Sequence, residues 1–127
     1  MKTNSKFKKI VAYKALQETL RKKAIKSGVN LLAPETIFLS KDTKFGKNVT
    51  INPYVVIDKK VKIGNNVNIL SFSHIEGAKI GNKVTIGPYA RIRSGTHLMQ
   101  GVKIGNFVET KKSKIKSNSK VSHLSYI

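Results

Sequence analysis

Aliphatic residues recur at every sixth position from residue 39 to the end of the chain, with polar residues between them. A five-residue step occurs twice, from Ile75 to Ile80 and from Thr110 to Ile115, and each time it resets the frame. The frame positions are Leu39, Phe45, Ile51, Ile57, Ile63, Ile69, Ile75, Ile80, Ile86, Ile92, Leu98, Ile104, Thr110, Ile115, Val121 and Ile127.

A second set of small or β-branched residues follows the frame positions by four residues. This set contains Thr43, Val49, Val55, Val61, Val67, Ser73, Val84, Ala90, Thr96, Val102, Val108, Ser119 and Ser125, and in the two shortened units Ala78 and Ser113 come three residues after the frame position. Glycine follows the frame residue directly in several units, often next to asparagine, as in "IGNN", "IGNK" and "IGNF".

A six-residue period is the sequence signature of a parallel β-helix. Three units form one triangular coil, in which each frame residue points inward and each small residue fits near a corner. Successive coils then pair as parallel strands about 4.8 Å apart. Gly and Asn suit the corners because they tolerate backbone conformations that are closed to most residues. The fifteen units from 39 to 127 therefore predict an all-β fold, a parallel β-helix of about five coils.

The first 28 residues have a different period and predict an α-helix. Apolar residues recur at intervals of three or four, which is the spacing of one helix face, at Phe7, Ile10, Tyr13, Leu16 and Leu20. We expect this stripe to be a packing face, with Ser27-Gly28 ending the helix. Residues 29–38 are expected to form a connector, so the predicted organisation is a basic helix (1–28), a connector (29–38) and a β-helix (39–127).

Composition limits the classes of protein that fit. The chain has no cysteine, which excludes disulfides and thiolate metal sites, and no apolar run long enough for a signal peptide or a membrane span, so a cytoplasmic protein is expected. A net charge of +19, from 25 Lys+Arg against 6 Asp+Glu, attracts polyanions. Codon bias toward Lys, Asn and Ile is the alternative explanation. The outward lysines are expected to surround the coil without forming a stripe, and few aromatic residues interleave with them, so nucleic acid is not the favoured partner.

The frame also places two cations together. Arg93 follows Ile92 and Lys111 follows Thr110, three units later, so the two side chains are expected on adjacent coils in one column. Such a pair is repulsive unless an anion such as phosphate lies between them. Either this is an anion site, or it is part of a solvated lysine-rich surface.

Two residues near the C-terminus add possible chemistry. His123 lies on the last side of the last coil, where it could act as a general base, and Tyr126 lies near the corner that leads back to Arg93 and Lys111. His74 and His97 are expected to be ordinary surface residues. The three histidines do not converge in this frame, so no metal site is expected.

The "Ile-Gly-x-x-Val" unit resembles that of the hexapeptide-repeat acyltransferases, whose coils are left-handed and which form trimers with active sites between neighbouring subunits. More specifically, "GPYARIRSG", "VKIGNFVETKKS" and "SKVSHLSYI" stand in the order found in the GlmU family, in the C-terminal domain of the bifunctional N-acetylglucosamine-1-phosphate uridyltransferase/glucosamine-1-phosphate acetyltransferase. The resemblance spans nearly the whole chain and is most specific from Ser73 to Ile127. It implies a left-handed β-helix that acetylates glucosamine-1-phosphate with acetyl-CoA, in the pathway to UDP-N-acetylglucosamine.

By the same resemblance, Arg93 and Lys111 bind the sugar phosphate, Tyr126 contacts the same substrate, and His123 is the catalytic base. The pattern also departs from the family. The uridyltransferase domain, with its magnesium site, and the distal coils that complete the sugar site and the acetyl-CoA cleft have no counterpart here, and Ile127 would begin an uncapped coil. Two alternatives to an active homotrimer therefore stay open: a non-catalytic remnant that keeps the phosphate column, or half of an enzyme completed by a second polypeptide.

Overall fold

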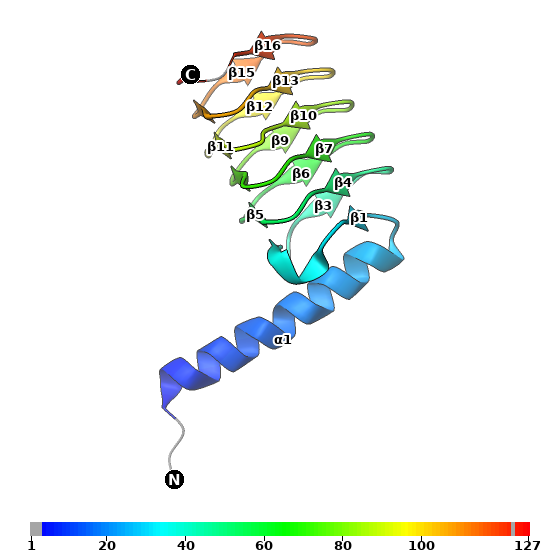
Figure 1. The fold of residues 1–127 in the computed structure, drawn as a ribbon, viewed down its shortest axis with the longest axis vertical. Helices are drawn as coiled ribbons and strands as arrows, with labels where there is room; N and C mark the ends of the chain where they lie inside the picture. Colours follow the sequence, from blue (N-terminus) through cyan, green and yellow to red (C-terminus); the bar gives the residue numbers. More distant parts are fainter. Residues whose placement is uncertain (1–3, 123) are drawn as a thin grey trace.

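The structure is a computed structural model that describes residues 4–122 and 124–127. It begins with helix α1 (Ser5–Lys26), which is followed by a triangular stack of coils, with a short 3₁₀ helix (Pro34–Thr36) between the first two strands. Figure 1 shows the stack rising from the C-terminal half of α1, while the N-terminal half of the helix projects away from the coils.

Three parallel sheets form the sides of the stack, and each coil adds one short strand to each sheet. Face A contains β1 (Asn30–Leu31), β4 (Thr50–Ile51), β7 (Asn68–Ile69), β10 (Thr85–Ile86), β13 (Lys103–Ile104) and β16 (Lys120–Val121). Face B contains β2 (Ile37–Phe38), β5 (Val55–Ile57), β8 (His74–Ile75), β11 (Ala90–Ile92) and β14 (Val108–Thr110). Face C contains β3 (Lys44–Phe45), β6 (Lys62–Ile63), β9 (Lys79–Ile80), β12 (His97–Leu98) and β15 (Lys114–Ile115).

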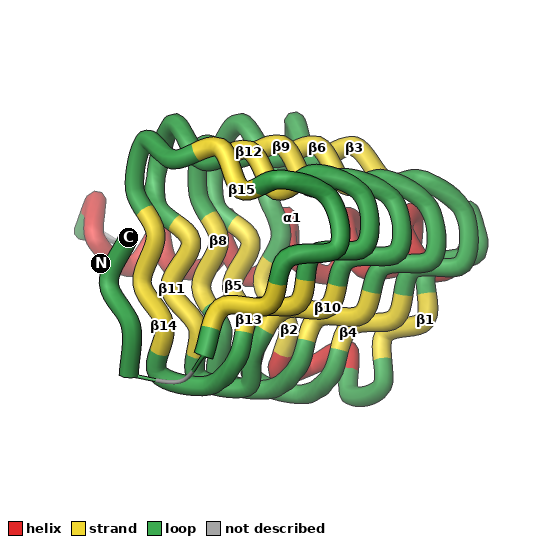
Figure 2. Tube along the Cα trace, turned by 90° about the horizontal axis from the view of Figure 1, so that it is seen from above, coloured by secondary structure: helices red, strands yellow, loops and turns green. Residues whose placement is uncertain are grey.

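The coils are left-handed, as the resemblance implied. Figure 2 looks down the stack from its C-terminal end, and the chain passes from face A through face B to face C in a clockwise sense as it approaches the reader. The predicted parallel β-helix of about five coils with an N-terminal helix is therefore confirmed.

The register confirms the six-residue frame and both short units. Ile57 pairs with Ile75 and Ile92 pairs with Thr110, whereas Ile75 pairs with Ile92 at the shorter separation that a five-residue unit produces. Frame residues from Ile51 to Ile104 are almost fully buried, and they form one continuous core with the small residues of the second set. Ile127 departs from the frame prediction, because its side chain is 43% exposed.

Two expectations for the N-terminal part differ from the structure. The segment expected as a connector already supplies strands β1 and β2, and Ile37 is completely buried. The predicted packing stripe on the helix is wrong at Phe7 and Ile10, which are more than half exposed, whereas the Tyr13 ring stacks on Phe38 with centroids 6.2 Å apart.

Helix α1 is anchored by a polar contact that its periodicity did not indicate. Gln17 is 1% exposed, its side-chain amide donates to the Leu39 carbonyl at 2.8 Å, and its carbonyl oxygen accepts from the Leu39 amide at 2.8 Å. This two-way bond satisfies the backbone groups at the open lower end of the stack, where no further coil pairs with Leu39.

An exposed row of aromatic residues runs along the edge between faces A and B. We call this row the aromatic ladder; it consists of Tyr54, Phe72, Tyr89 and Phe107, with ring centroids 5.3, 4.9 and 5.1 Å apart from one ring to the next. All four have positive φ angles of 55–62°, a conformation that is costly for residues with a Cβ. Face-to-face stacking on the next coil offsets part of that cost.

Candidate functional site

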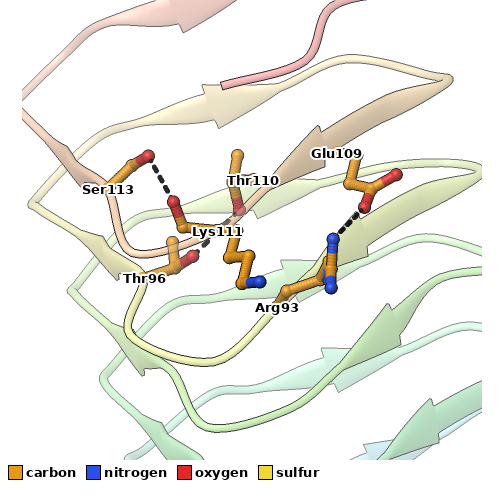
Figure 3. A network of polar contacts seen from close by, with 6 residues as sticks. All are labelled: Arg93, Thr96, Glu109, Thr110, Lys111 and Ser113. Atoms are coloured by element: carbon orange, nitrogen blue, oxygen red, sulfur yellow. Dashed lines mark hydrogen bonds and ion pairs between the residues drawn. The ribbon is translucent and has the colours of Figure 1, made fainter.

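Arg93 and Lys111 lie at the corner between faces B and C, on adjacent coils near the C-terminal end of the stack. Arg93 directly follows β11 and Lys111 directly follows β14, and the preceding residues, Ile92 and Thr110, are register partners. The Arg93 amide donates to the Thr110 carbonyl at 2.8 Å. Figure 3 shows the Lys111 side chain extending from the upper coil toward the coil that carries Arg93.

The charge at this corner changes sign along the stack. Asp58 and Glu76 occupy the corresponding corner position on the two coils below, since each directly follows its face B strand. Arg93 and Lys111 then follow on the two coils above. The upper part of the corner therefore attracts an anion, whereas the lower part repels one.

Glu109 is a site residue that the sequence analysis missed. Its carboxylate lies 2.9 Å from the Arg93 guanidinium, in a pair whose side chains are 31% and 32% exposed (Figure 3). In register Glu109 lies opposite Arg91 rather than Arg93. The frame alone could not reveal the pair, because the guanidinium reaches across the strand from the corner.

The backbone at Lys111 is held on both sides. Its amide donates to the Ile127 carbonyl at 2.9 Å, and its carbonyl accepts from the Ser113 hydroxyl at 2.9 Å. Beneath it, the hydroxyl of the fully buried Thr110 lies 3.2 Å from that of Thr96. The hydroxyl of Thr110, a polar residue at a frame position, therefore has a hydrogen-bond partner inside the core. The Lys111 side chain is exposed and extends from a backbone that is held by hydrogen bonds.

Tyr126 lies one coil above Glu109, on the outer surface of face B. The two residues form an isolated parallel bridge, in which the Glu109 amide donates to the Ser125 carbonyl at 2.9 Å and the Ile127 amide donates to the Glu109 carbonyl at 2.8 Å. The Tyr126 side chain is 69% exposed. The structure thus brings Arg93, Lys111, Glu109 and Tyr126 to neighbouring positions along face B and its corner with face C. His123 lies outside the described residues.

The other two histidines lie on the outer surfaces of different faces. His74 is on face B with its imidazole 3.9 Å from the Asp58 carboxylate, a partner that the sequence analysis did not identify. His97 is on face C, directly between Lys79 and Lys114 in register. Partial burial, followed by the charges of these two lysines, lowers the pKa of His97 below its ordinary value.

The corner presents two kinds of donor that suit an anion. A guanidinium offers a planar set of donors that suits phosphate, and an exposed ammonium on the next coil adds a second charge. Glu109 occupies one donor of Arg93 and lowers the local positive charge. A phosphate that binds here must therefore share Arg93 with this carboxylate or displace it.

Comparison with known proteins gives the class of this fold and site. The sequence matches the family described as bacterial transferase hexapeptide (six repeats) over residues 42–77 and 77–112. This match covers more than half of the chain, which therefore belongs to the bacterial hexapeptide transferase family.

Among curated proteins, the chain is similar to the bifunctional protein GlmU. It is 49% identical to GlmU of Azorhizobium caulinodans over 98% of this chain and 28% of that protein. It is 51% identical to GlmU of Zymomonas mobilis over 87% of this chain and 25% of that protein. The chain thus spans about a quarter of the length of these relatives, and it fits their C-terminal hexapeptide-repeat domain.

Solved structures show the same fold at low sequence identity. The acetyltransferase domain of PglB from Neisseria gonorrhoeae matches with a TM-score of 0.56 and 15% identity, over 87% of this chain and 63% of that one. A variant of GDP-perosamine N-acetyltransferase from Caulobacter crescentus matches with a TM-score of 0.51 and 14% identity, over 84% and 58%. The described residues include no helix long and apolar enough to cross a membrane.

Proposed function

We propose that this chain binds glucosamine-1-phosphate at the Arg93–Lys111 corner and transfers an acetyl group to it from acetyl-CoA. The observation that carries the proposal is the placement of Arg93 and Lys111 on adjacent coils with Tyr126 above them, in a chain about half identical to GlmU. The solved relatives, by their names, acetylate sugar amines or are acetyltransferase domains.

Each site residue has a separate role in this proposal. Arg93 and Lys111 hold the phosphate through charge-assisted hydrogen bonds, and Tyr126 contacts the same substrate from the next coil. The sugar amine attacks the thioester carbonyl, the carbon–sulfur bond breaks, and CoA leaves as its thiolate. The amine nitrogen loses a proton in this reaction, and His123 accepts it as general base. The role of His123 rests on the GlmU resemblance and on the chemistry of imidazole.

The assembly and the cellular setting belong to the same proposal. A homotrimer would place the corner of one copy beside a neighbouring copy, and residues from that copy, or from a second polypeptide, would complete the acetyl-CoA cleft. The product, N-acetylglucosamine-1-phosphate, is a precursor of UDP-N-acetylglucosamine. The reaction is placed in the cytoplasm, where acetyl-CoA is made and used.

The test separates binding from catalysis. Binding of glucosamine-1-phosphate is measured by calorimetry, and acetyl transfer is followed by the release of the CoA thiol, with the oligomeric state checked in the same sample. Arg93→Ala is expected to weaken binding by about 10- to 100-fold, because a hydrogen bond to a charged group is worth about 1.5–3 kcal/mol. Lys103→Ala, which removes an exposed lysine from face A, is the matched control and is expected to leave binding unchanged.

His123→Ala is expected to lower acetyl transfer by about 10²- to 10⁴-fold, the usual contribution of a general base, while sugar phosphate binding stays the same. Near-full activity in that variant would remove His123 from the mechanism. Binding that depends on Arg93, with no acetyl transfer from a well-folded sample, would favour the alternative of a non-catalytic phosphate-binding chain. Equal binding in the Arg93→Ala and Lys103→Ala variants would refute the site.

A further inference from the structure

A straight column of basic side chains runs up the outside of face C. We call it the cationic ladder; its successive rungs are register partners in the parallel sheet, at Lys44, Lys62, Lys79, His97 and Lys114. The four lysines are exposed and His97 is partly exposed. With coils about 4.8 Å apart, the five rungs span roughly 19 Å. The expectation that the lysines form no stripe is therefore wrong for this face.

No carboxylate lies in the ladder column itself, although Asp42, Asp58 and Glu76 border face C at its corner with face B. Glu109 lies in face B, and Asp58 and Glu76 directly follow face B strands. Asp42, which comes before β3, accepts a hydrogen bond from the Lys60 amide at the lower end of the stack, and the remaining two acidic residues lie in the N-terminal helix and the 3₁₀ helix. None of the outward positions of the described face C strands is acidic. The ladder column thus contains four lysines, one histidine and no carboxylate.

The other two faces provide an internal comparison. The register column on face A reads Asn30, Thr50, Asn68, Thr85, Lys103 and Lys120, which is mostly neutral. The column on face B reads Val56, His74, Arg91 and Glu109, which is mixed in sign. A chain with uniformly scattered lysines would show similar columns on all three faces. The concentration of lysines on face C therefore favours an anionic partner on that face.

The charges of the neighbouring rungs act on His97 and favour its uncharged form. Lys79 and Lys114, one coil below and one coil above, both act to lower the pKa of this histidine, in addition to its partial burial. An anion laid along the column would relieve the repulsion between neighbouring rungs.

A shallow groove lies along the middle of the ladder. It has a volume of about 410 Å³, and its lining includes Lys62, Lys79 and His97, with Gly64 and Gly81 at the corner beside them. The described residues that line it include no Phe, Tyr or Trp, so it lacks the large aromatic platforms on which bases stack. The groove therefore suits an extended anionic ligand that is recognised by its charges.

From the lysine column, its lack of carboxylates and the groove, we propose that the cationic ladder binds a linear chain of phosphate groups. Lysines stacked on a rigid, straight support match a polymer with a negative charge on every unit, with the mainly neutral His97 imidazole as a polar rung between Lys79 and Lys114, and each lysine contact displaces condensed counterions. The ligand chemistry is the phosphate chain itself, whether it comes from inorganic polyphosphate or from the backbone of a single-stranded nucleic acid. This binding is independent of the reaction proposed for the Arg93–Lys111 corner.

The test compares two variants that lose the same charge from different places. The ladder variant carries Lys62→Gln, Lys79→Gln and Lys114→Gln. The control variant carries Lys22→Gln, Lys103→Gln and Lys120→Gln, which removes three exposed lysines from α1 and face A. Binding of fluorescent oligo(dT) is followed by anisotropy from low to physiological salt, and inorganic polyphosphate is added as a competitor. Circular dichroism and glucosamine-1-phosphate binding verify that both variants keep the fold and the corner site.

The ladder variant is expected to bind oligo(dT) at least tenfold more weakly than the unchanged chain at 100 mM salt. Its slope of log affinity against log salt should be smaller by about 2, because each lost phosphate contact removes about 0.7 from the slope for a single strand. The control variant should change less than threefold, and polyphosphate should displace oligo(dT) from the unchanged chain.

Three results would overturn the proposal. Equal losses in the two variants would mean that diffuse charge, not the ladder, binds the polyanion. Oligo(dT) that polyphosphate cannot displace would mean that the bases are recognised. Tighter binding to phosphatidylglycerol vesicles than to either polymer would mean that face C docks on an anionic surface instead of a chain.

Discussion

Replacing Phe72 with alanine should destabilise the β-helix more than its exposed position suggests. The Phe72 ring is 51% exposed, but it stacks between Tyr54 and Tyr89, with centroid distances of 5.3 and 4.9 Å. Each aromatic pair is worth about 0.5–1.5 kcal/mol. The half-buried ring adds about 1 kcal/mol of apolar burial. The expected loss in the free energy of unfolding is therefore about 2–4 kcal/mol.

A glycine variant separates stacking from backbone strain. Phe72 has a φ angle of 62°, which costs a residue with a Cβ roughly 1–2 kcal/mol. Phe72→Ala keeps this cost, whereas Phe72→Gly relieves it. The glycine variant should therefore be more stable than the alanine variant by about 1–2 kcal/mol, although both lose the two ring contacts.

Urea unfolding followed by far-UV circular dichroism, repeated at several protein concentrations, measures these differences. Phe7→Ala is the control, because Phe7 is 57% exposed on the projecting half of α1 and has no ring stacked on it among the described residues. That variant should change stability by less than about 0.5 kcal/mol. Equal effects of Phe7→Ala and Phe72→Ala, or a glycine variant less stable than the alanine variant, would refute the argument that stacking supports this edge.

Three further predictions concern other parts of the molecule. Gln17→Leu should lower the free energy of unfolding by about 2–4 kcal/mol, because it leaves the amide and the carbonyl of Leu39 without their side-chain partner. It should also make α1 more accessible to proteases, and an unchanged rate of proteolysis would contradict this. Glu109→Gln should tighten the binding of inorganic phosphate by about two- to fivefold at low salt, because a partly exposed ion pair is worth about 0.5–1 kcal/mol. Weaker binding would instead mean that Glu109 positions Arg93. The pKa of His97 is lowered from 6.5 in the folded chain, so the unfolded chain binds more protons as the pH falls through that range. The free energy of unfolding, measured with urea, should therefore drop from pH 7.5 to 5.5 by more in the unchanged chain than in the His97→Asn variant. Equal drops in the two proteins would show that the pKa shift is negligible.

The sequence was sufficient to predict the β-helix because each coil repeats the same requirement. An inward position must be apolar in every unit, so the frame from Ile51 to Ile104 carries the same information many times over. The first strands lacked this redundancy. β1 and β2 each have two residues, and they lie before the frame becomes regular, so their segment was expected to be a connector.

The helix and the candidate site show two different limits of sequence reasoning. A 3.6-residue apolar stripe indicates a helix face but not which part of it is covered, and the projecting half of α1 leaves Phe7 and Ile10 exposed. Arg93 and Lys111 were placed on adjacent coils by counting units, because backbone register fixes their positions. The ion pair of Arg93 with Glu109 was not predicted, since it depends on how a long side chain bends across a strand.

The cationic ladder was missed for another reason. Its rungs lie three units apart in the sequence, and the charge was considered unit by unit, where lysines occur at many outward positions. The fold places every third unit on the same face. Only when the units are grouped in this way does the lysine column on face C differ from the columns on faces A and B.

The two five-residue units have a consequence for how this protein can change in length. Both fall at the corner between faces B and C, where β8 leads to β9 and β14 leads to β15, and the core residues on either side stay in register. This corner can therefore absorb the deletion of a single residue, whereas elsewhere in the chain such a deletion would turn the inward residues outward. Because Arg93 and Lys111 stand at the same corner, the spacing around these two cations could be altered by insertion or deletion during evolution, without any change in the packing of the stack.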